Sequence, residues 1–449
     1  MFAVAFSRNH IPKAPTVRQI QRYCLTAPAN LGRAVILVVV IHTSSSTGRC
    51  LKPFASHNGI IIMERIYLDN AATSWPKPES VYAAVDHAQR VIGSPAGRGT
   101  SEQAVAAMRL VEQTRGLVAE LINAPDRRNI SFTFNGTDSL SAAIMGLLKK
   151  GDHVVTSVVE HNSVLRPLTH LESQAMIETT FVGCDPTGTF DQDEVIAAIR
   201  PETRLVCLIH ASNVTGSVQP IENIKRRILG TGNDRVLFLL DAAQSLGHLS
   251  IDVQKIGCDI LAAPGHKAML GPLGTGVLYI ADNVSDQISP FRFGGTGSVG
   301  SAEFQPTKTP EKFEAGNLNV PGIAGLNAGI KFLTSEEGIA ASENLKRLSK
   351  LILDGVDAID GVKLQGLGSC ENRVGVFSLS IEGFGCHEAA GILDSSLQIQ
   401  SRAGIHCAPL LHRALGTEEG GGTLRLSPGL FNTTVDIEKA LEVIAQITG

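Results

Sequence analysis

The first 62 residues of this chain contain no aspartate or glutamate, whereas seven lysines and arginines fall within them. The remaining residues carry 32 basic against 43 acidic side chains, a formal charge of −11, although the whole chain sums to only −4. Contacts to a nucleic-acid backbone need clustered Lys and Arg. We therefore expect no nucleic-acid partner for the acidic body of the chain.

Long apolar runs and paired cysteines are also missing. The longest apolar run spans residues 34–41, far short of the roughly 20 residues that a membrane helix needs. None of the eight cysteines forms a C-x-x-C pair, and no Cys/His spacing matches a zinc site. We therefore expect free thiols in a reducing compartment, no bound metal, no membrane segment and a soluble, cytoplasmic protein.

The basic leader, residues 1–62, is excluded from the predicted fold. Its composition is typical of a transit peptide, but Pro12, Pro15 and Pro28 interrupt it and no clear amphipathic helix is present. Globular patterning begins near Met63, so an upstream extension from a misplaced start codon is the other interpretation. A targeting signal therefore stays open beside the cytoplasmic location.

The body of the chain alternates between two hydrophobic periods. Helical spacing predicts helices over residues 79–92 and 102–122. Short apolar runs then alternate with helix-like stretches, and these runs cover residues 130–134, 153–159, 204–210, 236–240, 260–263 and 277–280. This alternation predicts an α/β fold with a mostly parallel sheet that is covered on both faces.

The final third has a different pattern. Helical spacing predicts helices over residues 322–333 and 340–359 and a terminal helix from Val435. Strand-like segments lie at residues 374–381 and 423–426. We predict a large domain over residues 63–325, whose N-terminal segment lies near a smaller α+β domain over residues 326–449.

Two predicted strands end in groups that suit an aldehyde cofactor. In A-P-G-H-K, residues 263–267, Lys267 stands on a tight turn after a strand, where its amine suits a covalent bond to such a cofactor. Asp241 follows a buried strand, where its charge needs a partner such as a protonated pyridine nitrogen. A surface lysine and a structural ion pair are the alternative interpretations.

Three further strand ends are also polar. In N-G-T-D-S, residues 135–139, Gly136 permits a close backbone approach and Thr137 or Asp138 can cap a helix whose first amides suit a phosphate. His161 in V-E-H-N-S and Asn213 in H-A-S-N-V-T-G follow strands too. Each alone fits a structural role, but together they favour a ligand site at one edge of the sheet.

These motifs resemble those of a known enzyme family. Y-L-D-N-A-A-T, G-T-D-S, V-E-H-N-S, H-A-S-N-V-T-G, L-D-A-A-Q-S-L-G-H, G-H-K, F-E-A-G-N and S-R-A-G-I-H-C occur in family order from about Ile66 to the C-terminus. The series is similar to the pyridoxal-phosphate-dependent cysteine desulfurases of the class V aminotransferase superfamily, in the branch with a compact active-site loop. The resemblance implies a fold type I transferase with a seven-stranded-type sheet, and a homodimer.

The resemblance assigns roles around pyridoxal 5′-phosphate. It implies that Lys267 holds the cofactor covalently, that Asp241 pairs with the pyridine nitrogen, that Gln244 bonds to the ring hydroxyl and that His161 stacks on the ring. The residues implied to bind the phosphate are Gly136, Thr137 and His266.

It also assigns the substrate groups. Arg425 in T-L-R-L-S matches the arginine that grips the carboxylate of L-cysteine, and Asn213 and Arg402 are expected beside that substrate. The resemblance also implies that Asn213 binds the cofactor, near its ring hydroxyl. Cys407 in R-A-G-I-H-C matches the cysteine that takes the sulfur as a persulfide, releasing alanine and passing the sulfur to an acceptor protein. We expect its thiol to ionise with help from His406 or Arg402, whereas a buried, inert cysteine is the alternative.

Two residues depart from the family pattern. Pro264 stands where relatives usually have a serine or threonine that donates to the phosphate, and Asn317 stands where a threonine often reaches the phosphate of the partner subunit. Three functions therefore stay in competition: a cysteine desulfurase, another enzyme on the same scaffold such as a selenocysteine lyase, epimerase or aminotransferase, and a non-catalytic paralogue.

Overall fold

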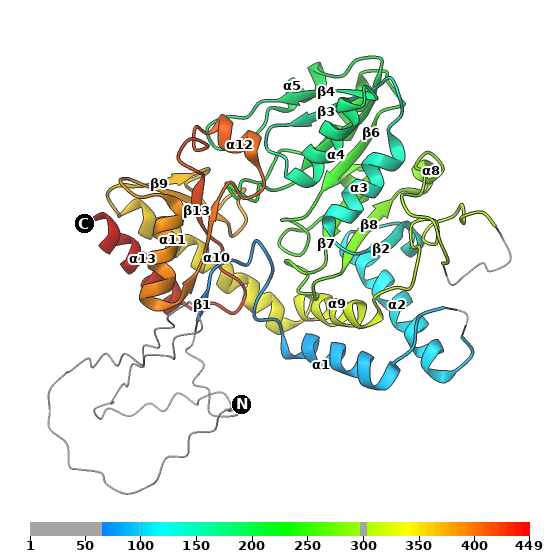
Figure 1. Ribbon diagram of the computed structural model, residues 1–449, viewed down its shortest axis with the longest axis horizontal. Coiled ribbons are helices and arrows are strands. Elements are labelled where there is room, and N and C mark those ends of the chain that lie inside the picture. The colour runs from blue at the N-terminus through cyan, green and yellow to red at the C-terminus, as the bar shows by residue number, and fades with distance from the viewer. Residues whose placement is uncertain (1–64, 98, 297–302) are drawn as a thin grey trace, which may run out of the picture. The chain divides into compact units, whose positions relative to one another are not determined.

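The computed structural model describes residues 65–97, 99–296 and 303–449, so the predicted leader lies outside the described residues. A seven-stranded sheet in the order β2-β8-β7-β6-β5-β3-β4 forms its largest element (Figure 1). Its strands are β2 (Ile130–Thr133), β3 (Asp152–Ser157), β4 (Ile177–Val182), β5 (Thr203–Ile209), β6 (Leu237–Asp241), β7 (Ile260–Pro264) and β8 (Gly276–Ile280). Because only β8 runs antiparallel to its neighbours, the prediction of a mostly parallel sheet in an α/β fold is confirmed.

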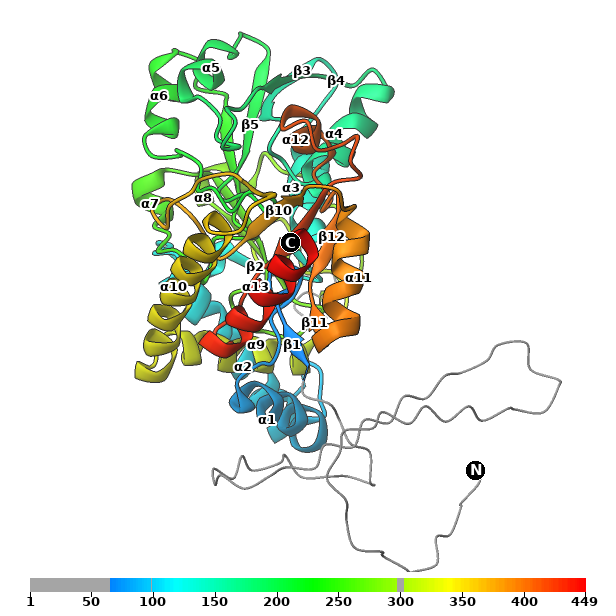
Figure 2. The same ribbon diagram turned by 90° about the vertical axis from the view of Figure 1, so that its left-hand side faces the viewer.

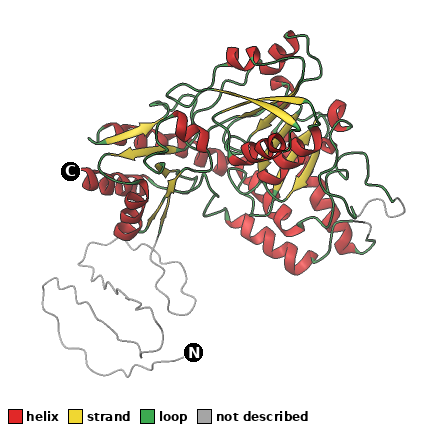
Figure 3. Ribbon diagram, turned by 45° about the horizontal axis from the view of Figure 1, so that its top comes forward, coloured by secondary structure: helices red, strands yellow, loops and turns green. Residues whose placement is uncertain are grey.

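Successive residues of the central strands pack into two different cores, as the period of a strand requires. Val206 and Leu240 belong to one core, whereas their neighbours Cys207 and Leu239 belong to the other. The helices of the first core are α2 (Glu102–Leu121) and α9 (Val320–Leu333), and those of the second are α3 (Gly136–Leu147) and α4 (Asn162–Ser173). Helices therefore cover both faces of the sheet (Figure 3).

A second, antiparallel sheet of four strands has the order β12-β13-β10-β9. Its strands are β9 (Val362–Gln365), β10 (Phe377–Ile381), β12 (Arg402–Gly404) and β13 (Thr423–Leu426). Its core also contains side chains of α10 (Glu336–Asp357), α11 (Cys386–Leu397) and α13 (Thr434–Thr448) (Figure 2). This part agrees with the predicted α+β pattern of the final third, while the domain boundaries themselves stay a prediction.

The N-terminal segment of the described chain joins this C-terminal part. Strand β1 (Ile66–Tyr67) pairs in parallel with β11 (Ile399–Gln400), and Asp69 continues the pairing by bridging to Ser427. The blue β1 accordingly lies beside the orange and red elements in both ribbon views (Figures 1 and 2). Residues near both ends of the described chain therefore meet beside β13.

The remaining helices are short. They are α1 (Glu79–His87) with a π-helical turn (Ala88–Ile92), α5 (Gln192–Ala197), α6 (Ile224–Gly230), α7 (Val253–Ile256), α8 (Asp282–Ser285) and α12 (Pro409–Ala414), together with a 3-10 turn (Arg127–Asn129). Helix α10 begins four residues before the predicted position, because Ser335 caps it by accepting a hydrogen bond from Gly338 N. Within the described ranges, no helix has the length and apolarity needed to cross a membrane.

Candidate active site

Lys267 and Asp241 lie at the ends of adjacent strands. Asp241 is the last residue of β6 and pairs with Ala262 of β7, and Lys267 follows β7 by three residues. Among the described residues, the Lys267 amine has no hydrogen-bond or ion-pair partner. Burial lowers its pKa to about 8, although the negative charge of Asp241 acts in the opposite direction. Part of this lysine is therefore a neutral amine near neutral pH, as a nucleophile requires.

The Asp241 carboxylate is almost completely buried, with 1% of the residue exposed. Its one direct hydrogen bond comes from Ala243 N to Oδ1 at 2.9 Å. Burial raises its pKa, while this bond and the Lys267 charge act against the rise. A buried carboxylate with a single donor suits a further cationic partner, and a protonated ring nitrogen is such a partner.

Gly136 and Thr137 begin α3, but the cap of this helix is Asn135, not Thr137 or Asp138 as expected from the sequence. Asn135 Oδ1 accepts from Asp138 N at 2.9 Å. A Cβ on Gly136 would stand 3.1 Å from the ring of Pro264, so a larger residue at this helix start would force Pro264 to shift by a few tenths of an ångström. Pro264 therefore packs against the predicted phosphate loop, although it has no hydroxyl to donate.

His161 is held by the start of the next helix. Its Nδ1 accepts from Ser163 N at 3.0 Å, so in the neutral ring Nε2 carries the proton. Ser163 Oγ lies 2.9 Å from the same nitrogen and 2.7 Å from Thr137 Oγ1, which connects the predicted stacking and phosphate residues. Burial, followed by the Lys267 charge, lowers the pKa of His161 to about 4. The ring is therefore uncharged at neutral pH.

His266 is fixed by residues that sequence reasoning missed. Its carbonyl oxygen accepts from Ser74 N at 3.1 Å, Thr73 Oγ1 at 3.1 Å, Ser74 Oγ at 3.2 Å and Lys77 Nζ at 3.4 Å. This carbonyl belongs to the peptide that joins His266 to Lys267. The N-terminal segment thus fixes the backbone next to Lys267. The same segment also contacts Gln244, whose Nε2 donates a hydrogen bond to Ala71 O at 3.0 Å.

Arg425 is a buried guanidinium on β13. Its Nη2 donates to Asp69 Oδ1 at 2.8 Å and its Nη1 donates to Asn213 O at 3.0 Å. Arg402 on β12 binds the same Asp69 carboxylate. Asp69 was not singled out from the sequence, although it stands in the quoted Y-L-D-N motif, because no local signal showed that it would face two arginines.

Cys407 lies exposed on the loop between β12 and α12. A Cys407 thiolate raises the pKa of Lys267, Arg402 and Arg425, so its charge acts on all three cations. Burial lowers the pKa of His406 to about 2, so this imidazole carries no charge at neutral pH, whereas Arg402 stays cationic. The expectation that one of these two residues helps the thiol to ionise stays a prediction.

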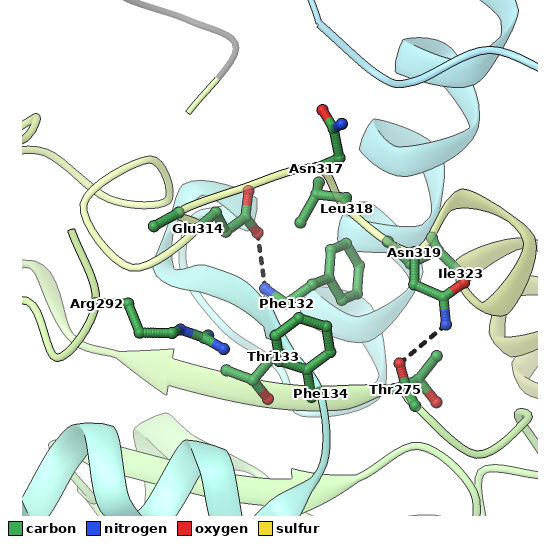
Figure 4. Close-up of a pocket in the computed structure, with 12 residues that line it drawn as sticks. Phe132, Thr133, Phe134, Thr275, Arg292, Glu314, Asn317, Leu318, Asn319 and Ile323 are labelled. Carbon is green, nitrogen blue, oxygen red and sulfur yellow. Dashed lines mark hydrogen bonds between the residues drawn. The ribbon is translucent and has the colours of Figure 1, made fainter. Parts of the chain in front are cut away.

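Asn317 lies apart from these residues, at a pocket of about 20 Å³ beside the end of β2 (Figure 4). This volume holds about one water molecule, so the pocket is too small for a cofactor. Asn317 is exposed and points away from the two phenylalanines of the pocket, Phe132 and Phe134 (Figure 4). Its predicted role concerns a second copy of the chain and stays a prediction.

Buried polar atoms of this site are suited to contact a cofactor and an amino acid. Several buried polar atoms near it have no partner among the described residues, and they include His266 Nδ1, Asn213 Oδ1 and Arg425 Nε. Buried polar atoms in native proteins nearly always have partners. Together with a free amine and a buried carboxylate, these atoms form a donor and acceptor set that fits a phosphorylated pyridine aldehyde and a carboxylate-bearing substrate.

The fold and this arrangement of strand ends define a class of enzyme. The chain belongs to the aminotransferase class-V family, whose model matches residues 66–440, and this family uses pyridoxal phosphate. A probable cysteine desulfurase of Methanothermobacter thermautotrophicus is 34% identical over 392 residues, covering 87% of this chain and 96% of the relative. A probable cysteine desulfurase of Pyrococcus abyssi is also 34% identical, over 396 residues, covering 86% of this chain and 95% of the relative.

Solved structures agree with these relatives. The apo cysteine desulfurase of Thermococcus onnurineus superposes with a TM-score of 0.79 at 32% identity, covering 86% of this chain and 94% of that one. A cysteine desulfurase of Escherichia coli in an S-sulfonic acid form gives a TM-score of 0.75 at 28% identity, covering 85% of this chain and 94% of that one. The chain is thus homologous to cysteine desulfurases over nearly all of the described residues.

Proposed function

We propose that this protein is a pyridoxal-phosphate-dependent cysteine desulfurase that removes sulfur from L-cysteine and keeps it as a persulfide on Cys407. The observation that carries the proposal is the Cys407 thiol. It is exposed, and the negative charge of its thiolate form acts on Lys267 and Arg425. A class V enzyme that only exchanges amino groups has no need of a thiol at this position. The names of the similar proteins support the same activity.

The cofactor would be held by residues from several strand ends. Lys267 would bind its aldehyde carbon, Asp241 its ring nitrogen and Gln244 its ring hydroxyl, and the neutral His161 would cover the ring. The amides and hydroxyls assigned to the phosphate belong to Gly136, Thr137 and His266 and to the segment around them. When bound, pyridoxal phosphate supplies an electron-withdrawing ring that stabilises negative charge on the α-carbon of an amino acid.

The chain's own residues would bind the substrate and move its protons. Arg425 would accept the carboxylate of L-cysteine through donors that its contacts to Asp69 and Asn213 leave unused, including the unpartnered Nε. The amine of Lys267 would carry a proton to and from the substrate carbon. Its pKa of about 8 suits both directions of transfer near neutral pH.

Cys407 would take the sulfur directly. In the net reaction the Cβ–S bond of L-cysteine breaks, an S–S bond forms on Cys407 Sγ, and the proton of the Cys407 thiol goes to the substrate Cβ, which becomes the methyl group of alanine. The electron pair of the broken Cβ–S bond stays on Cβ, so this carbon is reduced as the transferred sulfur is oxidised to the sulfane level, and no external oxidant is needed. Because Cys407 is exposed, a sulfur-acceptor protein would be able to reach the persulfide. We also propose a homodimer, in which Asn317 would face the partner subunit.

Replacement of Cys407 by alanine tests the proposal. We expect Cys407→Ala to bind pyridoxal phosphate with unchanged visible absorbance but to lose alanine and sulfide release from L-cysteine in the presence of a reductant. Cys370→Ala is the matched control, because Cys370 is also exposed but has no assigned role. Normal turnover by Cys407→Ala would exclude the persulfide on this residue.

The same assay separates the alternatives. Alanine from selenocysteine but not from cysteine would indicate a selenocysteine lyase. A racemised amino acid or a keto acid would indicate an epimerase or an aminotransferase. Purified protein that takes up no pyridoxal phosphate at all would support the non-catalytic paralogue.

A further inference from the structure

One carboxylate, that of Asp69, lies between the two arginines that were expected at the substrate. Arg402 contacts it three times, with Nε at 3.2 Å from Oδ1 and 3.0 Å from Oδ2, and Nη2 at 2.9 Å from Oδ2. Arg425 contacts it once, with Nη2 at 2.8 Å from Oδ1. Arg402 therefore satisfies most of the acceptor capacity of Asp69.

The backbone around Asp69 cannot move away from Arg425. Leu68 O accepts from Ser427 N at 2.7 Å, and Asn70 N donates to Ser427 O at 3.0 Å. Ser427 follows Arg425 by two residues, and the carbonyl oxygen of Asp69 accepts a further bond from Tyr67 Oη at 3.2 Å. The backbone of Asp69 is thus fixed beside the strand that carries Arg425, so its carboxylate is within reach of the Arg425 guanidinium.

This placement makes Asp69 a potential competitor of the substrate. Arg425 is buried, with 3% of its side chain exposed, and its Nε has no partner in the described part of the chain. A guanidinium and a carboxylate pair most strongly through two parallel hydrogen bonds. If Asp69 turned both oxygens to Arg425, this fork would be occupied before an amino acid arrived. The three contacts from Arg402 hold the carboxylate in a different orientation.

We propose that Arg402 is a positioning residue, which holds Asp69 so that the fork of Arg425 stays open, and that it does not itself bind the substrate carboxylate. This inference rests on the proposed function, because it takes an amino acid as the ligand of Arg425. It differs from the role expected from the sequence, in which Arg402 contacts the substrate. The side chain of Arg402 is half exposed, 49% accessible, and two of its three guanidinium nitrogens, Nε and Nη2, already contact Asp69.

The two roles predict different behaviour in a double-mutant cycle. We expect Arg402→Met to raise KM for L-cysteine about tenfold in the wild-type background, because Asp69 is released to occupy Arg425. In the Asp69→Asn background the same substitution should change KM less than about twofold, since no competing carboxylate is left. Loss of the Arg402 charge near Cys407 would act on kcat, and equally in both backgrounds.

A second Arg–Asp fork provides the control for the cycle. Arg128 binds Asp126 through Nε and Nη2 on the surface, away from the site. Arg128→Met, alone and with Asp126→Asn, should leave KM and kcat at wild-type values. Arg402→Gln repeats the cycle with a polar side chain in case the methionine variant folds poorly.

Equal increases of KM in both backgrounds would overturn the proposal, because they would mean that Arg402 binds the substrate directly. No increase in the wild-type background would also overturn it. Calorimetric binding of butyrate, which has a carboxylate but neither amine nor thiol, should follow the same pattern across the four variants. Butyrate binding does not depend on turnover, so it tests the role of Arg402 even in a protein that is inactive. A lack of desulfurase activity in the wild-type protein would instead refute the proposed function.

Discussion

Glu160, which immediately precedes His161, is a fully buried carboxyl group with 0% exposure. Its Oε1 accepts from Ser157 Oγ at 2.7 Å and from Ile209 N at 3.0 Å, whereas its Oε2 is buried and no described residue contacts it by a hydrogen bond. Burial raises its pKa to about 8, and the charge of Asp241 acts in the same direction. Glu160 is therefore a neutral acid in the folded protein at neutral pH.

The raised pKa makes stability depend on pH with a defined sign. An exposed glutamate in the unfolded chain ionises near pH 4.3, whereas the folded chain keeps the proton until about pH 8. The contribution of Glu160 is thus fully present below about pH 4.3 and is lost as the pH rises to about 8. Each pH unit of this window is worth about 1.4 kcal/mol, and less near pH 8, where the folded chain also begins to lose the proton. The free energy of unfolding should therefore fall by roughly 3–4 kcal/mol between pH 5 and pH 8 on account of this group.

Glu160→Gln removes this titration and keeps the acceptor oxygen. The buried amide nitrogen, which would stand where Oε2 has no partner, costs about 1–3 kcal/mol at every pH. We therefore expect the variant to have a lower free energy of unfolding than the wild type at pH 5. Between pH 5 and pH 8 the difference should shift in favour of the variant by roughly 3–4 kcal/mol. Urea unfolding followed by the fluorescence of the single tryptophan, Trp75, measures this difference.

Glu178→Gln is the control for this experiment. Glu178 is exposed, and its hydrogen bond from Arg200 lowers its pKa, so its contribution is constant from pH 5 to pH 8 and is lost only in more acidic solution. The difference between this variant and the wild type should therefore not change across the window. A flat difference between Glu160→Gln and the wild type over the same range would refute the reasoning, because Glu160 would then be ionised in the folded chain.

Two further substitutions test the charges around the site. Asp241→Asn removes the negative charge that raises the pKa of Lys267, so half-maximal uptake of pyridoxal phosphate by the cofactor-free protein should shift to a pH below that of the wild type, as followed by visible absorbance. Arg115→Met removes the cation that contacts Glu314 at 2.7 Å inside the protein. It should lower the free energy of unfolding by about 3–5 kcal/mol, and the double variant with Glu314→Met should lose less, because no buried charge is then left unpaired.

The positions of Lys267 and Asp241 could be predicted because they depend on local pattern. An apolar run marks a buried strand, and the residue after the run stands at its end. Parallel neighbouring strands then bring such ends to one edge of the sheet, as β6 and β7 do. The same pattern, an apolar run followed by polar residues, predicts the turns that carry Gly136, His161 and Asn213.

The pairing of Asp69 with two arginines could not be read in this way. Arg402 and Arg425 are separated from Asp69 by 333 and 356 positions, and a two-residue strand such as β1 gives no periodic signal. The charge state of His406 was also hidden, since it depends on burial beside Thr423 and Arg425, which local sequence does not report. Contacts of this kind require the tertiary fold.

The strained Cys407 loop shows how the two kinds of information combine. His406 and Cys407 both have positive φ angles, +49° and +59°, which for residues other than glycine cost of order 1–3 kcal/mol each. Each carbonyl is held by a residue from a sheet edge: Asn213 Nδ2 donates to His406 O at 2.6 Å, and Asn162 N donates to Cys407 O at 2.7 Å. Asn162 follows the predicted ring-stacking histidine, His161. The strand ends that were predicted to hold the cofactor therefore also hold the backbone of Cys407, so displacement of either turn would move Cys407 as well.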